Sequence, residues 1–202
     1  MPPEKEKAYI RKEIETIAKI CGEPPKGWYY GRLSRRSQAL VWDVYKKMGV
    51  SLLWDSDSYA DDLPYWADVS SEMKEEKPQG MLMIHYSYGQ SSPFPLFCYH
   101  LTKADCNDYK FNIPTDFGSP THFHDHIKNA FDTLYEEGCE GSPKMVTIAL
   151  HCCIGKPGRF GALKKIVEYI SQKEGVWVAT RTQIAEHLEI GFPISLGTLH
   201  LV

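Results

Sequence analysis

Apolar residues recur with helical spacing near the start of the chain. They lie three or four positions apart, with Lys and Glu between them, at Ile10, Ile14, Ile17 and Ala18. This spacing places the apolar side chains on one face of a helix. Pro2 and Pro3 suit a helix start, and Gly22 suits its end. The pattern predicts a helix over residues 4–20 with one buried face.

Strand and helix patterns alternate in the next thirty residues. Residues 27–32 read as a short aromatic strand, which Gly31 and Arg32 end. Ser34 then suits the cap of a helix that runs to Met48 and whose inner face carries Leu40, Val41, Val44 and Tyr45. Residues 50–53 read as a short buried strand. Such alternation is typical of a parallel sheet, in which ligands bind at the carboxyl ends of the strands.

The second half of the chain continues this alternation. The pattern predicts strands over residues 81–88, 144–150 and 175–179. It predicts helices over residues 120–137, ended by Gly138, over 160–172, after a tight loop at 155–158, and from the cap Thr180 to Leu188. Residues 144–150 are the most apolar of the expected strands, and His151 follows them directly.

Acidic and aromatic side chains are concentrated in residues 54–66, at the end of the expected strand 50–53. This stretch holds four Asp, two Trp and two Tyr. Paired carboxylates at a strand end suit acid–base chemistry or cation binding, and aromatic rings suit the walls of a pocket. The alternative is a solvated turn, because Asp and Ser favour turns and Pro64 stiffens one. Composition alone favours the turn; the second polar strand end, at His151, favours a site.

Other polar clusters carry weaker signals. His122, His124 and His126 alternate near the start of a predicted helix, where they would diverge around the axis, so a solvated helix entrance is favoured over a metal site. Cys152 and Cys153 are adjacent, and two half-buried thiols are favoured over a nucleophile or a metal pair.

Composition limits the class of protein. The chain has 202 residues, of which 43% are hydrophobic and 24% charged, so it can bury a core of single-domain size. A net charge of -3 gives no electrostatic reason to expect a nucleic acid or an anionic membrane as a partner. The six Cys lack regular CxxC spacing, and no apolar run follows Met1. We therefore expect a cytoplasmic protein with a small-molecule substrate.

Six segments together resemble the polysaccharide deacetylase superfamily, in particular its cytosolic branch of allantoinases and deacetylase-like relatives. The most specific is the acidic run from Asp55 to Trp66. The others are residues 27–32, 107–108, 130–138, 150–152 and 155–159. The resemblance implies a partial deformed (β/α) barrel of the NodB type. It also implies hydrolysis of a non-peptide carbon–nitrogen bond, in an N-acetylated amino sugar or in a cyclic ureide such as allantoin.

The resemblance also implies roles for particular residues. His151 corresponds to a general acid, and Arg32 orients an acid or the substrate. The residues implied in substrate binding are Asp57, Tyr59, Asp61, Trp66 and Asn107. We expect the side chains that follow the strands, namely Arg32, Asp57, Asp61, Trp66 and His151, to gather at one rim.

The matching segments correspond to the C-terminal portion of the superfamily's domain. Its catalytic Asp and the Asp-His-His set that binds a divalent metal such as zinc precede the segment where this chain begins. We therefore expect no metal ligand or cofactor in this chain, and no activity from the chain by itself. Two alternatives remain, namely a catalytically inactive binding or regulatory half-domain and a shortened gene model of a full-length enzyme. The substrate and any homo-oligomeric state stay open.

Two segments depart from the resemblance within a single N-terminally truncated domain over residues 1–202. Residues 89–104 show neither helical nor alternating periodicity, and without them residues 81–88 join directly to 105–111, as in the superfamily. Their composition suits a translated intron; the alternative is a lineage-specific surface loop, which costs little to lengthen. The tail, residues 188–202, is more apolar than the usual ending.

Overall fold

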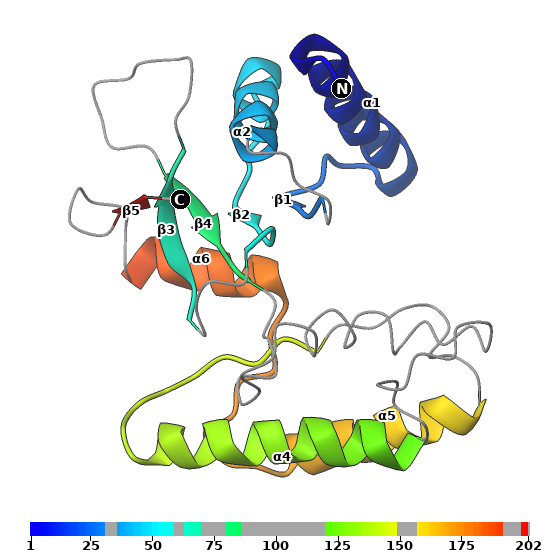
Figure 1. Ribbon diagram of the computed structural model, residues 1–202, viewed down its shortest axis with the longest axis vertical. Helices are drawn as coiled ribbons and strands as arrows, with labels where there is room; N and C mark the ends of the chain where they lie inside the picture. The colour runs from blue at the N-terminus through cyan, green and yellow to red at the C-terminus, as the bar shows by residue number, and fades with distance from the viewer. Residues whose placement is uncertain are drawn as a thin grey trace. The chain divides into compact units, whose positions relative to one another are not determined.

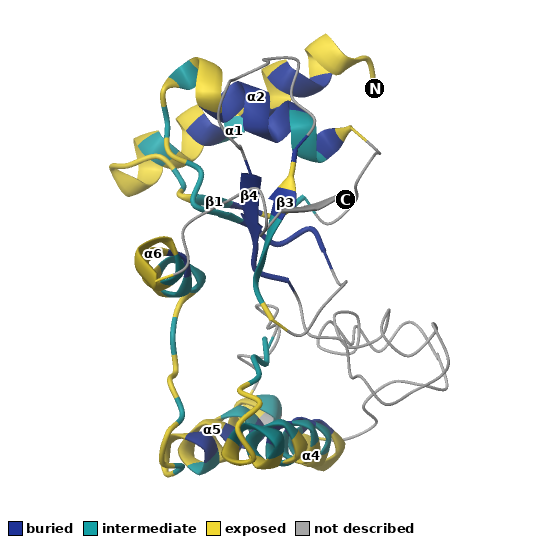
Figure 2. Cartoon of the chain, turned by 90° about the vertical axis from the view of Figure 1, so that its left-hand side faces the viewer, coloured by how far each residue is buried: buried dark blue, intermediate teal, exposed yellow. Residues whose placement is uncertain are grey.

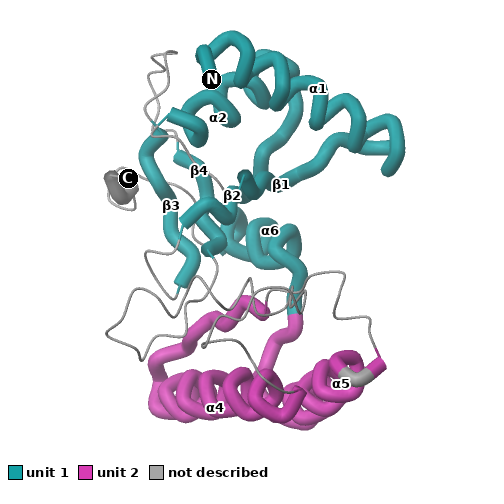
Figure 3. Tube along the Cα trace, turned by 45° about the vertical axis from the view of Figure 1, so that its right-hand side comes forward, with its two compact units in different colours: residues 1–85, 179–202 teal, residues 86–178 magenta. Residues whose placement is uncertain are grey.

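A computed structural model describes residues 1–30, 36–58, 63–69, 80–85, 120–148, 157–191 and 199–201. The chain divides into two compact units, shown in two colours in Figure 3. Unit 1 comprises residues 1–85 and 179–202, and unit 2 comprises residues 86–178. That both belong to one domain stays a prediction. The segment 89–104 lies outside the described residues.

Two helices of unit 1 lie side by side (Figure 1). Helix α1 (Pro3–Cys21) begins at a proline and ends at Gly22, which has a φ of 86°. Helix α2 (Ser37–Met48) ends at Gly49, which has a φ of 66°. Both predicted helix ends are confirmed to within a residue. Glycine suits these positions because it adopts the left-handed conformation without a steric penalty. The predicted start of the second helix is wrong, since Arg36, not Ser34, occupies the N-cap position.

Five short strands form a mixed sheet in unit 1. They are β1 (Gly27–Trp28), β2 (Trp54–Asp55), β3 (Tyr65–Asp68), β4 (Gly80–Met83) and β5 (Leu199–Leu201), in the order β1-β2-β4-β3-β5. The pairs β1–β2, β2–β4 and β3–β5 are parallel. The sheet is open over the described residues, and the α/β class with a partial sheet of the NodB type is confirmed.

Several details of the sheet differ from the sequence prediction. Strand β1 ends at Trp28, so Tyr29 and Tyr30 of the predicted strand 27–32 lie outside it. Strand β3 pairs with β4 in antiparallel register, whereas the alternation of strands and helices predicted parallel pairs. The strand expected at residues 50–53 is displaced to Trp54–Asp55, where the backbone reaches its partner β1. Strand β5 comes from the tail that was predicted to be atypical, and it pairs with β3.

The core of unit 1 lies between the helices and one face of the sheet. Ile10 and Ile14 of α1 pack with the predicted inner face of α2 and with Trp28 of β1. A second cluster joins Trp42 of α2 to Ala67, Met81 and Met83 of β3 and β4. Figure 2 shows β4 as buried along its length. The carboxyl ends of β1 and β2 are thus fixed against α2.

Unit 2 contains two packed helices, α4 (Pro120–Cys139) and α5 (Pro157–Ser171). Their apolar contact comprises Phe123, Ile127, Phe131, Ala162, Ile166 and Ile170. Helix α4 continues past Gly138, so that glycine does not end it. Helix α5 begins at Pro157, so residues 157–158 form its first turn and not a loop. Proline is well tolerated there because the first turn requires no N–H donor.

Two expected strands are not strands over their described residues. Residues 144–148 are half-buried and 176–179 belong to no strand, and Trp177 and Val178 are 57% and 74% exposed. Val146, Ile148 and Val176 instead pack against the α4–α5 cluster. The apolar side chains of these two segments therefore pack against helices. A strand would also require a neighbouring strand with which its backbone forms hydrogen bonds.

Helix α6 (Arg181–Gly191) returns to unit 1 and contacts β2. Thr180 caps it as predicted: its hydroxyl accepts from the backbone N–H of Gln183 at 3.3 Å. The Gln183 side chain accepts from the Thr180 backbone N–H at 2.8 Å, which completes a capping box. The helix ends at Gly191, three residues later than the predicted Leu188. No helix in the described ranges is long and apolar enough to cross a membrane.

Candidate functional site at the end of strand β2

The chain leaves β2 through four consecutive polar residues that are all buried. Asp55, Ser56, Asp57 and Ser58 have exposed fractions of 0%, 1%, 6% and 8%. Backbone bonds hold this turn on both sides: Ser56 N donates to Trp28 O at 3.0 Å, and Ile84 N donates to Asp55 O at 2.8 Å. The Ser56 hydroxyl also donates to Ile84 O at 2.6 Å. The acidic stretch therefore begins as a buried polar turn, and the alternative of a solvated turn is wrong for residues 55–58.

Asp55 carries the most perturbed carboxyl group of the described sheet. Burial raises its pKa to about 7, and the nearby Asp57 charge adds to this effect. The backbone N–H of Asp57, which donates to Asp55 Oδ1 at 2.8 Å, and Gln38 oppose the shift. A buried carboxyl that titrates near neutral pH can hold or release a proton under physiological conditions.

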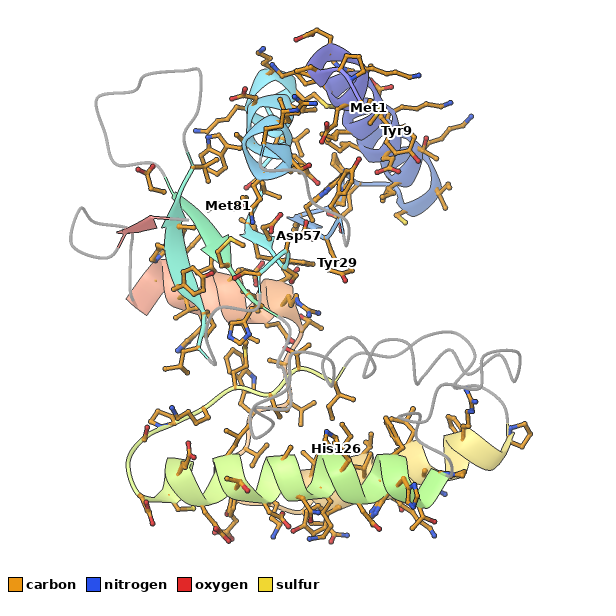
Figure 4. The ribbon with its side chains drawn as sticks, in the orientation of Figure 1. Met1, Tyr9, Tyr29, Asp57, Met81 and His126 are labelled. Atoms are coloured by element: carbon orange, nitrogen blue, oxygen red, sulfur yellow. The ribbon has the colours of Figure 1, made fainter. Side chains whose placement is uncertain are left out.

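Asp57 connects the ends of two parallel strands. Its Oδ2 atom accepts from the backbone N–H of Tyr30 at 2.6 Å, just after β1. Its carbonyl oxygen accepts from Gln38 Nε2 of α2 at 3.3 Å. Figure 4 shows Asp57 at this end of the sheet, near Tyr29. A charged acceptor strengthens such a bond, so Asp57 fixes the backbone from which the chain continues toward Arg32.

Further polar groups lie at or near this turn, and the sequence analysis assigned them no individual part in the site. The hydroxyls of Ser58 and Tyr65 lie 2.5 Å apart and join the β2 turn to the start of β3. Gln38 reaches the turn from α2, and His85, just beyond β4, is fully buried. Ser58 and Tyr65 lie within the acidic and aromatic stretch 54–66, and His85 is a polar residue inside an apolar strand pattern, whereas nothing in the sequence indicated Gln38.

Trp66 lies on β3, half-buried and in register with Leu82 of β4. Successive side chains on a strand point to opposite faces. Tyr65 and Ala67 pack toward α2, so Trp66 faces the other side of the sheet. Trp66 and Asp57 thus belong to the same unit, and β4 lies between their strands in the sheet. The part of Trp66 in lining a pocket stays a prediction.

The other predicted site residues lie outside the described part of the chain. They are Arg32, Tyr59, Asp61, Asn107 and His151. Their gathering with Asp57 and Trp66 at one rim stays a prediction.

The described ranges contain no group of three or more His, Cys, Asp or Glu side chains that could hold a metal ion. Among the three histidines of α4, His122 is exposed, and His124 Nδ1 lies 2.9 Å from Asp125 Oδ1. Burial lowers the pKa of His126, which favours its neutral form. These histidines do not converge on one point.

An open α/β sheet with buried acidic residues at the carboxyl end of a strand defines a class of proteins that bind ligands at that edge. No protein-family model matches the chain. A Schizosaccharomyces pombe protein named as a polysaccharide deacetylase is 42% identical over 191 residues, which cover 92% of this chain and 55% of that protein.

Solved structures agree with this sequence similarity. The crystal structure of PuuE allantoinase is 34% identical, with a TM-score of 0.72, and the match covers 96% of this chain and 56% of that one. A Pseudomonas aeruginosa PAO1 structure named as a polysaccharide deacetylase is also 34% identical, with a TM-score of 0.73 and the same coverage. The predicted resemblance is confirmed: the chain is related in sequence and in fold to the polysaccharide deacetylases. It spans about half the length of the relatives it matches.

Proposed function

We propose that this chain is part of a hydrolase that cleaves a non-peptide carbon–nitrogen bond, in an N-acetylated amino sugar or in a cyclic ureide. The observation that carries the proposal is the similarity along nearly the whole chain to a protein named as a polysaccharide deacetylase, at 42% identity, and to PuuE allantoinase, at 34%. Both names denote hydrolysis of such a bond.

The buried turn after β2 supports a site at this edge of the sheet. The Asp57 Oδ2 atom accepts a hydrogen bond from the Tyr30 backbone N–H at 2.6 Å, and Arg32 follows Tyr30 by two residues. Asp57 therefore acts in this proposal by positioning the segment that carries Arg32, in addition to its predicted part in shaping the pocket. Catalysis depends on such positioning, because small displacements of a charged group reduce its effect strongly.

His151 is the proposed general acid. An imidazole titrates near neutral pH and can donate a proton to the leaving nitrogen as the carbon–nitrogen bond breaks. Arg32 is proposed to orient an acid group or the substrate, and Trp66 and Tyr59 to line the pocket with Asp61 and Asn107. The proposal assigns no step to a metal in this chain.

The chain spans 55% of its S. pombe relative, so activity is proposed for the whole protein and not for these 202 residues alone. A chimera tests this, in which the matching segment of the S. pombe protein is replaced by this chain. The isolated chain and the chimera are each assayed with allantoin and with N-acetylated amino-sugar oligomers, and the parent protein serves as the positive control.

We expect no turnover by the isolated chain and hydrolysis of one substrate class by the chimera. A folded chimera that hydrolyses neither class, beside an active parent, would contradict the proposal and favour a binding or regulatory module. Turnover by the isolated chain would show that the catalytic base lies within it.

A further inference from the structure

Trp28, Tyr45 and Asp55 each bury a polar atom that has no hydrogen-bond partner within the described residues. The atoms are Trp28 Nε1, Tyr45 Oη and Asp55 Oδ2. These residues are 6%, 1% and 0% exposed. Each buried polar atom left without a partner costs about 1–3 kcal/mol, so three within one small core are unlike the ordinary interior of a protein.

The three side chains belong to one layer, between α2 and the sheet. Trp28 and Asp55 are register partners on the adjacent strands β1 and β2, and register partners point to the same face. The Trp28 and Tyr45 rings meet edge to face, with centroids 6.0 Å apart. The Asp55 charge adds to burial in raising the pKa of the Tyr45 hydroxyl, which is consistent with both groups facing the same interior.

The chemistry of the three atoms is complementary. Trp28 Nε1–H can only donate, Asp55 Oδ2 can accept, and the Tyr45 hydroxyl can do either. A water molecule accepts two hydrogen bonds and donates two, so it can satisfy all three groups at once. A cation would face the N–H dipole of Trp28 unfavourably, and an apolar guest would leave every group unpaired. Buried waters typically make about three hydrogen bonds to polar groups of this kind.

We propose that Trp28, Tyr45 and Asp55 bind one internal water molecule that joins α2 to the ends of β1 and β2. The other carboxylate oxygen of Asp55 accepts the backbone N–H of Asp57 at 2.8 Å. The water therefore fixes the orientation of the Asp55 carboxyl group and, through the bond from Asp57, stabilises the buried turn. This inference is independent of the proposed function, because it concerns the layer between helix and sheet and not the substrate.

A crystal structure of the chain at a resolution that shows ordered solvent tests the proposal. We expect one solvent peak at hydrogen-bond distance, about 2.5–3.2 Å, from all three atoms. A direct hydrogen bond between Tyr45 and Asp55, or a dry interior, would overturn it.

The variant Tyr45→Phe tests the ligand set in the same crystal form. It removes one hydroxyl and keeps the ring, so the solvent peak should be lost. Tyr169→Phe is the matched control, because its hydroxyl donates to Asp132 at 2.6 Å in unit 2, and this variant should keep the peak. A peak that is unchanged in Tyr45→Phe would show that the hydroxyl is not a ligand, and the three-ligand site would be wrong.

Discussion

Gly27 tests how tightly β1 and β2 are packed at their first paired residues, Gly27 and Trp54. A Cβ atom at this position would lie 1.9, 2.2 and 2.3 Å from the Cε2, Cζ2 and Cδ2 atoms of Trp54. Carbon atoms pack at about 3.5–4.0 Å, so the substitution Gly27→Ala requires a displacement of about 1.5 Å. The indole ring of Trp54 thus lies directly over the Gly27 backbone.

Trp54 cannot make this movement without losing other contacts. Its Nε1 donates to Thr182 Oγ1 at 3.3 Å, and the Arg181 guanidinium lies 5.6 Å from the ring centroid. Overpacking in a well-packed core costs about 1–3 kcal/mol, and we expect Gly27→Ala to fall at the upper end of that range. For a chain of this length about 3 kcal/mol corresponds to a decrease in Tm of about 6–12 °C.

The assay is urea unfolding followed by far-UV circular dichroism and by tryptophan fluorescence. Gly161→Ala is the control: Gly161 lies on the exposed face of α5 with open space around its Cα, and alanine there should stabilise the helix by up to about 1 kcal/mol. If Gly27→Ala leaves the free energy of unfolding within about 0.5 kcal/mol of wild type, the packing of Trp54 on β1 is wrong.

Three other predictions concern Asp55, the cap of α6 and residues 89–104. Asp55 has a folded-state pKa of about 7, raised from 3.8, so the folded chain binds more protons than the unfolded chain between these values and its stability falls as pH rises from about 4 to 7. Asp55→Asn should remove that fall, on the order of 2–4 kcal/mol, in unfolding measured across this pH range, and an unchanged pH dependence would contradict the buried carboxyl. Thr180→Ala should cost about 1 kcal/mol and speed amide exchange in the first turn of α6, with Gln183→Ala giving a smaller loss; equal exchange in wild type and variant would rule out the capping box. Transcript sequencing across the codons for Tyr88 and Asp105 should find reads without residues 89–104, whereas retention in all reads would reject the intron hypothesis.

Local periodicity predicted the helices of the chain well. The apolar stripe of α1, the inner face of α2 and the capping box of α6 each depend on residues within a few positions of one another. Helical structure satisfies its own backbone hydrogen bonds, so nearby residues largely determine it. The errors at helix ends were Ser34, Gly138, residues 157–158 and Leu188, where neighbouring structure decides how far a helix continues.

Strands were predicted less well because a strand depends on a distant partner. Residues 144–148 and 176–179 have a strand-like composition, but Val146 and Val176 pack against α4 and α5. The antiparallel pairing of β3 with β4 also has no local signal. A short apolar run cannot by itself distinguish a strand from a segment that covers a helix.

The acidic run in the sequence indicated the candidate site. The hydrogen bonds and the shifted pKa within the site were not predicted. Composition predicted Asp57 but gave no indication that its carboxylate bonds the Tyr30 backbone, 27 residues away. The raised pKa of Asp55 likewise depends on burial against α2, which only the folded chain creates. The resemblance supplied His151 and Arg32, and their roles remain proposals.

The central claim, that this chain carries the general acid of a carbon–nitrogen hydrolase, is tested most directly by His151→Ala in the active chimera. The measurement is kcat/KM for the hydrolysed substrate between pH 5 and 9, with His126→Ala as the matched control on α4. We predict that His151→Ala lowers kcat/KM by about 10²–10⁴-fold and removes the limb of the pH profile due to an acid, as expected for loss of a general acid, while His126→Ala stays within about twofold of wild type. A His151→Ala chimera that is folded and retains its kcat/KM and pH profile would contradict the claim.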